Sequence, residues 1–158
     1  APNMINHHFG GKQALFDAII EQFSTDAMST PLRIIAEPAS TAAEFELKFQ
    51  LFITETFEIM IAHKEVFQIV SRENGVSLPL KEFRHGLNQF VENAHAAGLL
   101  RAEVDVSMVV GFVLDRLANQ IIYSASLADS EDQNVAANPN YRKHWLKSNI
   151  DLLLHGLV

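Results

Sequence analysis

Cysteine is absent from this sequence of 158 residues, which excludes both a disulfide framework and a thiolate metal site. Without cysteine, a reducing cytoplasm is the expected setting of the protein. Long hydrophobic runs are also missing. The longest uncharged apolar stretch, Ser107 to Leu114, stops at Asp115 and falls far short of the roughly 18 to 20 residues that cross a bilayer. We therefore expect neither a membrane span nor a membrane partner.

Basic residues are few, with 12 Lys and Arg against 19 Asp and Glu, and the net charge is -7. An acidic surface repels phosphate over most of its area, so any contact with nucleic acid must be local. Disorder is excluded, because 48% hydrophobic and 20% charged residues supply one substantial core at this length. Neither a signal peptide nor an initiator methionine is visible, so we expect the sequence to begin partway into a longer chain.

Apolar residues recur at spacings of three and four almost everywhere, and strict alternation over four or more residues is hard to find. This pattern predicts an all-α fold. One helix is expected after Gly10-Gly11, with a break or kink at Pro31. Further helices are expected over 41–62, 63–72, 79–97 and 105–127, and from Pro139 onward.

Capping residues mark the ends of several expected helices. Ser40 or Thr41 precedes one helix, and Glu44 is placed to complete a capping box. Asp105 is a second candidate N-cap, and Gly98 is placed to end the helix before it.

The last two long helices carry more apolar surface than one small domain covers. The stretch 105–127 is apolar nearly all round, while 128–140 is polar and acidic and is predicted to be a mobile loop. A large exposed apolar patch usually marks association, so we expect a homodimer. The expected interface includes Leu117, Ile121, Trp145, Ile150, Leu153 and Leu154. The alternative is that these helices form the core of the monomer.

The first sixteen residues form the most informative segment. Pro2 favours a short helix, Gly10-Gly11 ends it, and a second helix starts at once with Lys12 in its first turn. A lysine there opposes the helix dipole, and a bound phosphate would explain it, because free N–H groups and the ammonium would contact the same anion. The exposed face of the short helix carries the hydrogen-bonding residues Asn3, Asn6 and His7.

This segment resembles the end of the helix-turn-helix of TetR/AcrR-type transcriptional regulators. The matching positions are Ile5, His8, Phe9, Lys12 and Leu15. The order and length of the expected helices agree with that family over the whole chain. Three features depart from it: Asn6 replaces the usual Tyr, Gln13 replaces the usual acid, and the two helices that precede the motif are absent.

The resemblance implies a TetR-like helical bundle, with 1–26 as a remnant of the DNA-binding domain and 27–158 as the ligand-binding and dimerisation domain. It implies a ligand-responsive repressor that binds operator DNA as a homodimer and is released by a small-molecule effector. The residues expected to contact DNA are Pro2, Asn3, Asn6, His7, His8 and Lys12. Without the resemblance, His7 and His8 are better explained as one packed and one solvent-exposed histidine.

Two Glu-x-x-His patterns have the spacing found in di-iron helical bundles, at Glu82–His85 and Glu92–His95. Both lie on one expected helix, ten residues and therefore about 15 Å apart, so they cannot share a metal pair. A solvated helix face explains them better. Because no catalytic triad and no phosphate-binding loop is present either, we expect no enzyme activity, no metal and no cofactor.

Phenylalanine is abundant, with 11 residues, most of them on the middle helices. An aromatic stripe is usually core, but Arg116, Asn119 and Tyr123 lie at steps of three and four from one another and from Phe112. A few polar groups in an aromatic cavity are typical of a small-molecule site. The expected ligand-binding residues are Phe49, Phe52, Met60, Phe67, Phe83, Phe112, Arg116 and Asn119.

Two function classes therefore stay open. The first is the ligand-responsive repressor, and the second is a helical dimerisation or small-molecule-binding module with no role at DNA. A metal-dependent helical enzyme is a third and weaker alternative. Abundant Phe with one Arg favours a mainly apolar effector, aromatic or anionic in character.

Overall fold

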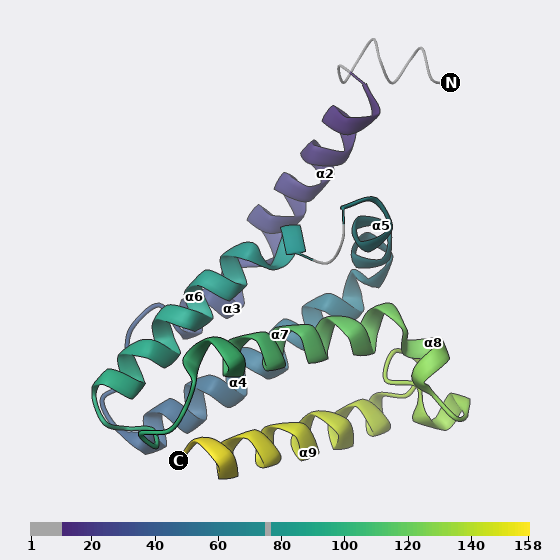
Figure 1. The fold of residues 1–158 in the computed structure, drawn as a ribbon. Helices are drawn as coiled ribbons and strands as arrows, with labels where there is room; N and C mark the ends of the chain where they lie inside the picture. Colours follow the sequence, from purple (N-terminus) through teal and green to yellow (C-terminus); the bar gives the residue numbers. More distant parts are fainter. Residues whose placement is uncertain (1–10, 75–76) are drawn as a thin grey trace.

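A computed structural model describes residues 11–74 and 77–158, and over these residues the chain is helical and has no β-strand (Figure 1). The elements are α2 (Lys12–Ala27), α3 (Ser29–Ile34), α4 (Ala42–Ala62), α5 (Lys64–Asn74), α6 (Ser77–Ala96), α7 (Val106–Ile122), α8 (Ser124–Leu127), the 3-10 turn η1 (Glu131–Gln133) and α9 (Pro139–Leu157). The prediction of an all-α fold is confirmed for this part of the chain.

The capping box at the start of α4 is confirmed. The Thr41 hydroxyl accepts a hydrogen bond from the Glu44 backbone N–H at 3.1 Å, and the Glu44 carboxylate accepts one from the Ser40 N–H at 2.9 Å. Lys48 forms an ion pair with the same carboxylate at 2.8 Å. The hydrogen bond from the Lys48 side chain, and then that from the Ser40 backbone, lowers the pKa of Glu44.

The ends of the next long helices follow the same local rules. Asp105 caps α7 by accepting a hydrogen bond from the Met108 N–H at 3.0 Å. Gly98 ends α6 with φ at 72°, a conformation that favours glycine. The Leu99 and Gly98 N–H groups donate to the carbonyls of Ala94 and His95, which is the Schellman arrangement.

Two predicted boundaries are wrong by a few residues. The break expected at Pro31 lies at Met28, because Pro31 occupies the first turn of α3, where a backbone N–H needs no helical partner. The helix expected over 105–127 ends at Ile122, and the chain turns at Tyr123 before α8 begins.

The core is built round α4, which packs against α3, α7 and α9. Phenylalanine rings join α4 to α6, because Phe45 stacks on Phe90 with centroids 5.3 Å apart and Phe52 meets Phe83 edge to face at 5.8 Å. All four side chains are almost fully buried. Such ring pairs each add about 0.5–1.5 kcal/mol to the stabilisation that their burial provides.

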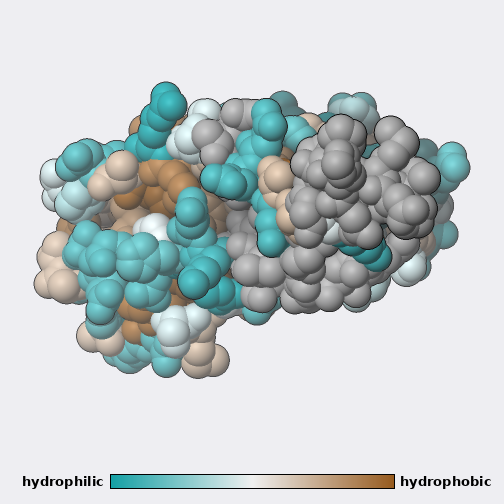
Figure 2. All heavy atoms as spheres, turned by 90° about the horizontal axis from the view of Figure 1, so that it is seen from above, coloured by the Kyte–Doolittle hydropathy of each residue, from teal (hydrophilic) through white to brown (hydrophobic). Residues whose placement is uncertain are grey.

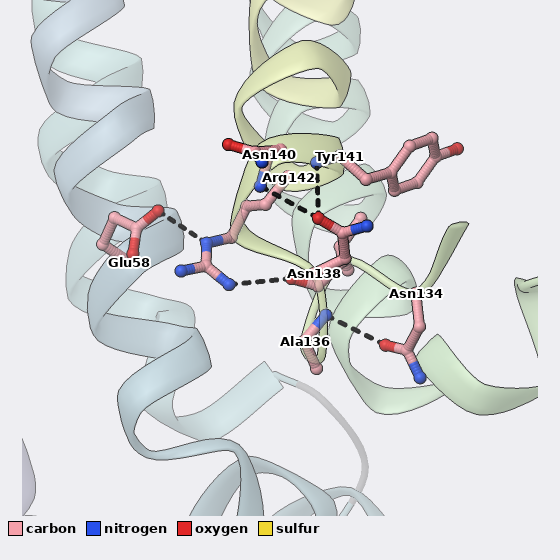
Figure 3. A network of polar contacts seen from close by, with 8 residues as sticks. Glu58, Asn134, Ala136, Asn138, Asn140, Tyr141 and Arg142 are labelled. Carbon is pink, nitrogen blue, oxygen red and sulfur yellow. Dashed lines mark hydrogen bonds and ion pairs between the residues drawn. The ribbon is translucent and has the colours of Figure 1, made fainter. Parts of the chain in front are cut away.

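The acidic segment between α8 and α9 is held at its centre. Val135 is fully buried, and Arg142 of α9 donates to the Val135 carbonyl at 2.9 Å and to the Glu58 carboxylate of α4 at 2.8 Å (Figure 3). The Asn138 side chain caps α9 by accepting from the N–H groups of the first helical turn. The segment lacks regular helix, as predicted, apart from the short turn η1. Its anchored centre argues against the predicted mobility.

Candidate association face and effector region

Helix α7 has a buried face and an exposed face. The buried face packs into the core with Val110, Val113, Leu114, Leu117, Ala118 and Ile121. The exposed face carries Met108, Phe112, Asp115, Arg116, Asn119 and Tyr123. The spacing of three and four that joins Phe112, Arg116 and Asn119 in the sequence therefore describes the outside of the helix.

The interpretation of Arg116, Asn119 and Tyr123 as buried polar groups is thus wrong, because all three are exposed. The sequence could not decide between the two faces of α7, since valine and leucine line one of them and Met108 and Phe112 begin the other.

The residues expected in a dimer interface are mostly buried inside the single chain. Leu117, Ile121, Trp145 and Ile150 lie in its core, while Leu153 and Leu154 are only partly buried. As the sequence alternative stated, much of the apolar surface of these helices is therefore core of one chain. The apolar residues that remain exposed for contact with a partner are mostly not those predicted from the sequence.

Met108 and Leu152 are the most exposed large hydrophobic side chains among the described residues, at 71% and 70%, and Phe112 is 52% exposed. Met108 and Phe112 lie on α7, and Leu152 lies on α9 beside the half-buried Leu153. We call these four residues the association face. Met108, Leu152 and Leu153 line a groove of about 510 Å³ that also reaches the loop before α7.

Arg116 lies beside the association face and is held against α9. Its guanidinium is 5.0 Å from the centre of the Trp145 ring, and its Nε donates to Asn149 Oδ1 at 3.4 Å. Trp145 in turn stacks on Phe57 of α4 with centroids 5.0 Å apart. The hollow that Phe112 and Arg116 line is almost closed, with a volume of about 10 Å³. It is therefore too small for an organic ligand.

The structure divides the predicted ligand-binding set. Phe49, Phe52, Met60, Phe67 and Phe83 are buried in the core, whereas Phe112, Arg116 and Asn119 lie on the outside of α7. The buried rings pack directly on neighbours rather than round a space, as the Phe52–Phe83 contact shows. A ligand among them would have to move side chains.

Thr56 is a polar group in this aromatic region that was not among the predicted site residues. It is fully buried on α4, one turn from Phe52 and Met60, and its hydroxyl has no hydrogen-bond partner among the described residues. Leaving a buried hydroxyl unpaired costs about 1–3 kcal/mol. Its place in the otherwise aromatic and aliphatic stripe of α4 was the signal available in the sequence.

Five of the six predicted DNA-contacting residues, Pro2, Asn3, Asn6, His7 and His8, lie outside the described residues. Lys12 is exposed and begins α2, as expected. Figure 1 shows α2 leaving the body of the molecule, so that its first turns lie apart from the other helices.

Near its other end, α2 is joined to the body by an aromatic side chain. Phe23 is buried and makes edge-to-face contacts with the rings of His63 at 4.9 Å and Phe67 at 5.3 Å. His63 ends α4 and Phe67 belongs to α5, so Phe23 joins α2 to the corner between these helices.

Among the described residues, no group of three His, Asp or Glu is placed to hold a metal ion. Glu82 and His85 border a groove on α6, and His95 Nε2 lies 3.2 Å from the Ala102 carbonyl. None of the described helices is long and apolar enough to cross a membrane.

Comparison of the chain with models of protein families, with curated proteins and with solved structures found no match. The function is therefore argued from the residues and from the geometry above.

Proposed function

We propose that this chain is the regulatory part of a ligand-responsive transcriptional repressor of the TetR/AcrR type, which binds operator DNA as a homodimer. The observation that carries the proposal is the association face on α7 and α9. A monomer rarely leaves such large apolar side chains exposed together on two helices, and an exposed apolar patch of this kind marks association.

The position of α2 supports the DNA-binding part of the proposal. Its exposed N-terminal end follows directly from the segment that resembles a recognition helix. A two-fold symmetric dimer would present two such segments to successive major grooves, about 34 to 36 Å apart or more. Lys12 would then contact a phosphate.

The effector is the least constrained component. To release DNA about 100-fold, an effector must favour the released state by roughly 2.7 kcal/mol. The unpaired hydroxyl of Thr56 supports binding inside the core, because a ligand acceptor or donor there would remove its cost. The tight packing of the surrounding rings requires that side chains move to admit the ligand.

The dimer is tested by light scattering of the purified chain. Leu152→Glu places a charge on the association face, and we expect it to weaken the dimer by at least about tenfold, or about 1.4 kcal/mol. Leu47→Glu is the matched control, because Leu47 is 58% exposed on the opposite side of α4 from the core. A parent chain that is monomeric at all concentrations, or two variants with equal effects, contradicts the proposal.

DNA binding is tested with the complete gene product that contains this chain, by selecting genomic fragments and measuring affinity against salt. Lys12→Gln should reduce the slope of log affinity against log salt by about one for each protomer. Lys143→Gln, an exposed change on α9, should leave the slope unchanged. If the protein dimerises but enriches no fragment over a protein that does not bind DNA, the alternative of a dimerisation or ligand-binding module is the better one.

A further inference from the structure

An open groove lies between the short helix α3 and one side of α6. Its volume of about 630 Å³ is within the range of small-molecule sites. Its lining residues are Leu32, Ile35, Ala36, Lys81, Glu82, His85, Gly86 and Gln89. Figure 2 shows the molecule from above, with hydrophobic surface between hydrophilic side chains on this face. The groove between α3 and α6 is defined by the residues that line it. We call it the α3/α6 groove.

Glycine and alanine shape the groove. A Cβ atom on Gly86 would lie 2.9 Å from Leu32 Cδ2, so the end of the Leu32 side chain packs directly on the glycine and would have to shift to admit a larger residue there. Beyond that contact, the small side chain of Ala36 leaves the apolar floor open. The floor is therefore a hydrophobic strip. The helices pack closely where Leu32 meets Gly86, and the groove is open beside Ala36.

The polar wall is arranged round α6. At 100° per residue, Glu82 lies about 40° from Gly86 and Gln89 about 60°, while Lys81 lies about 140° away. Glu82 and Gln89 are thus nearest the apolar floor, and Lys81 belongs to the outer rim. Neither Glu82 nor Lys81 has an ion pair or side-chain hydrogen bond among the described residues, and Gln89 is joined only to Asn93 at 3.4 Å.

We propose that the α3/α6 groove binds an amphipathic organic cation, with its apolar body on Leu32, Ile35 and Ala36 and its charged group at Glu82. The Glu82 carboxylate, on the side of α6 nearest the floor, has no ion pair within the described part of the chain, and the net charge of -7 raises the local concentration of cations. Lys81 lies at the rim on a flexible side chain, which can turn toward solvent.

The site would also explain regulation, and in that respect the inference rests on the proposed function. Only Met28 separates α3 from α2, so a ligand that moves α3 against α6 also shifts the helix that leads to the recognition segment. Binding itself can be measured on the chain without DNA. Its failure is therefore distinguishable from failure of the repressor proposal.

The test is fluorescence titration of the purified chain with a styrylpyridinium cation, 4-(4-dimethylaminostyryl)-1-methylpyridinium, and with the anion 8-anilinonaphthalene-1-sulfonate. We expect Glu82→Gln to weaken the cation by about tenfold or more and the anion not at all. Glu131→Gln removes the same charge on the distant segment before α9, and it should leave both dyes unchanged. Equal effects of the two variants on the cation overturn the proposal.

A groove-filling variant tests the location. Ala36→Trp should abolish cation binding, while Leu152→Glu on the association face should not change it. Ala36 is exposed, so thermal melting of this variant should match that of the parent. Cation binding that survives Ala36→Trp, or tighter binding of the anion than of the cation, shows that the assignment is wrong.

Discussion

The inner face of α4 and the outer face of α7 both carry large apolar side chains, but their surroundings are opposite. Phe45, Phe49 and Phe52 on α4 are completely buried, whereas Met108 and Phe112 on α7 are 71% and 52% exposed. In both helices large apolar side chains recur every three or four residues. Spacing therefore identifies a stripe, but whether another helix covers the stripe depends on the rest of the fold.

The two helices differ in what lies opposite the stripe. On α4 the other side carries polar residues such as Gln50 and Glu58, so only one face can enter the core. On α7 the other side carries Val110, Val113 and Leu114. These side chains are buried in the core, while Phe112 is half exposed. The outer face of α7 begins with Met108 and Phe112 and becomes polar only at Asp115, so the first two turns of this helix give a weaker signal than α4 does of which face is buried.

The largest expected effect on the free energy of unfolding is that of a substitution in the buried stripe of α4. Phe52→Ala removes a fully buried ring that packs on Phe83 and should lower the free energy of unfolding by about 3–5 kcal/mol. Urea unfolding followed by circular dichroism measures it. Leu47→Ala, on the exposed side of the same helix, should cost less than about 1 kcal/mol, and an equal cost would mean that the α4 faces are wrongly assigned.

The corresponding change on α7 should act on association instead. Phe112→Ala should change the unfolding of the isolated chain by less than about 1 kcal/mol, because the side chain is half exposed. It should raise the dimer dissociation constant by about tenfold, measured by sedimentation equilibrium. If the variant lowers the free energy of unfolding of the monomer by several kcal/mol and does not change the dimer dissociation constant, Phe112 belongs to the core, as Phe52 does.

A smaller effect is expected at Thr56, within the buried stripe of α4. Thr56→Val keeps the shape of the side chain and removes the unpaired hydroxyl, so it should stabilise the chain by about 1 kcal/mol. Thermal unfolding of the parent and the variant measures the difference. Destabilisation by the variant would show that the hydroxyl has a partner, such as a bound water.

The smallest expected effect is the acid sensitivity of the helix caps. The pKa of Glu44 is lowered from 4.5, first by Lys48, and that of Asp105 is lowered from 3.8, first by the Met108 N–H. A lowered folded-state pKa stabilises the fold above the ordinary value, and this contribution is lost as pH falls through the lowered one.

Between about pH 6 and pH 3, we therefore expect the melting temperature of the parent to fall more than that of Glu44→Gln. The glutamine keeps the shape of the cap but does not titrate. Parallel curves for the two proteins would show that the capping carboxylate adds nothing to acid sensitivity.

Local chemistry made much of the fold predictable. The caps at Thr41 and Asp105 and the stop at Gly98 depend on residues within one turn, and each was found where the sequence indicated. The boundary at Met28 was missed because a helix tolerates proline in its first turn, so Pro31 lies inside α3 and not at the break. The boundary at Tyr123 was missed because no glycine or proline marks it in the sequence.

The site was less predictable, because it depends on which helices pack against one another. Phe49, Phe52 and Phe83 are buried as an aromatic stripe should be, but their sequence spacing does not say whether rings meet each other or surround a ligand. The α3/α6 groove was missed altogether, because α3 and the middle of α6 are about fifty residues apart and only the fold brings them together.

The aromatic contacts of Phe23, near one end of α2, give that helix the geometry of a lever arm. Lys12 stands eleven residues from Phe23, which is about 16 Å at 1.5 Å per residue. A rotation of about 10° at the joint with His63 and Phe67 would thus carry Lys12 through about 3 Å, enough to break a hydrogen bond. By the same geometry, a small shift between the rings at this joint would be several times larger at the tip of α2.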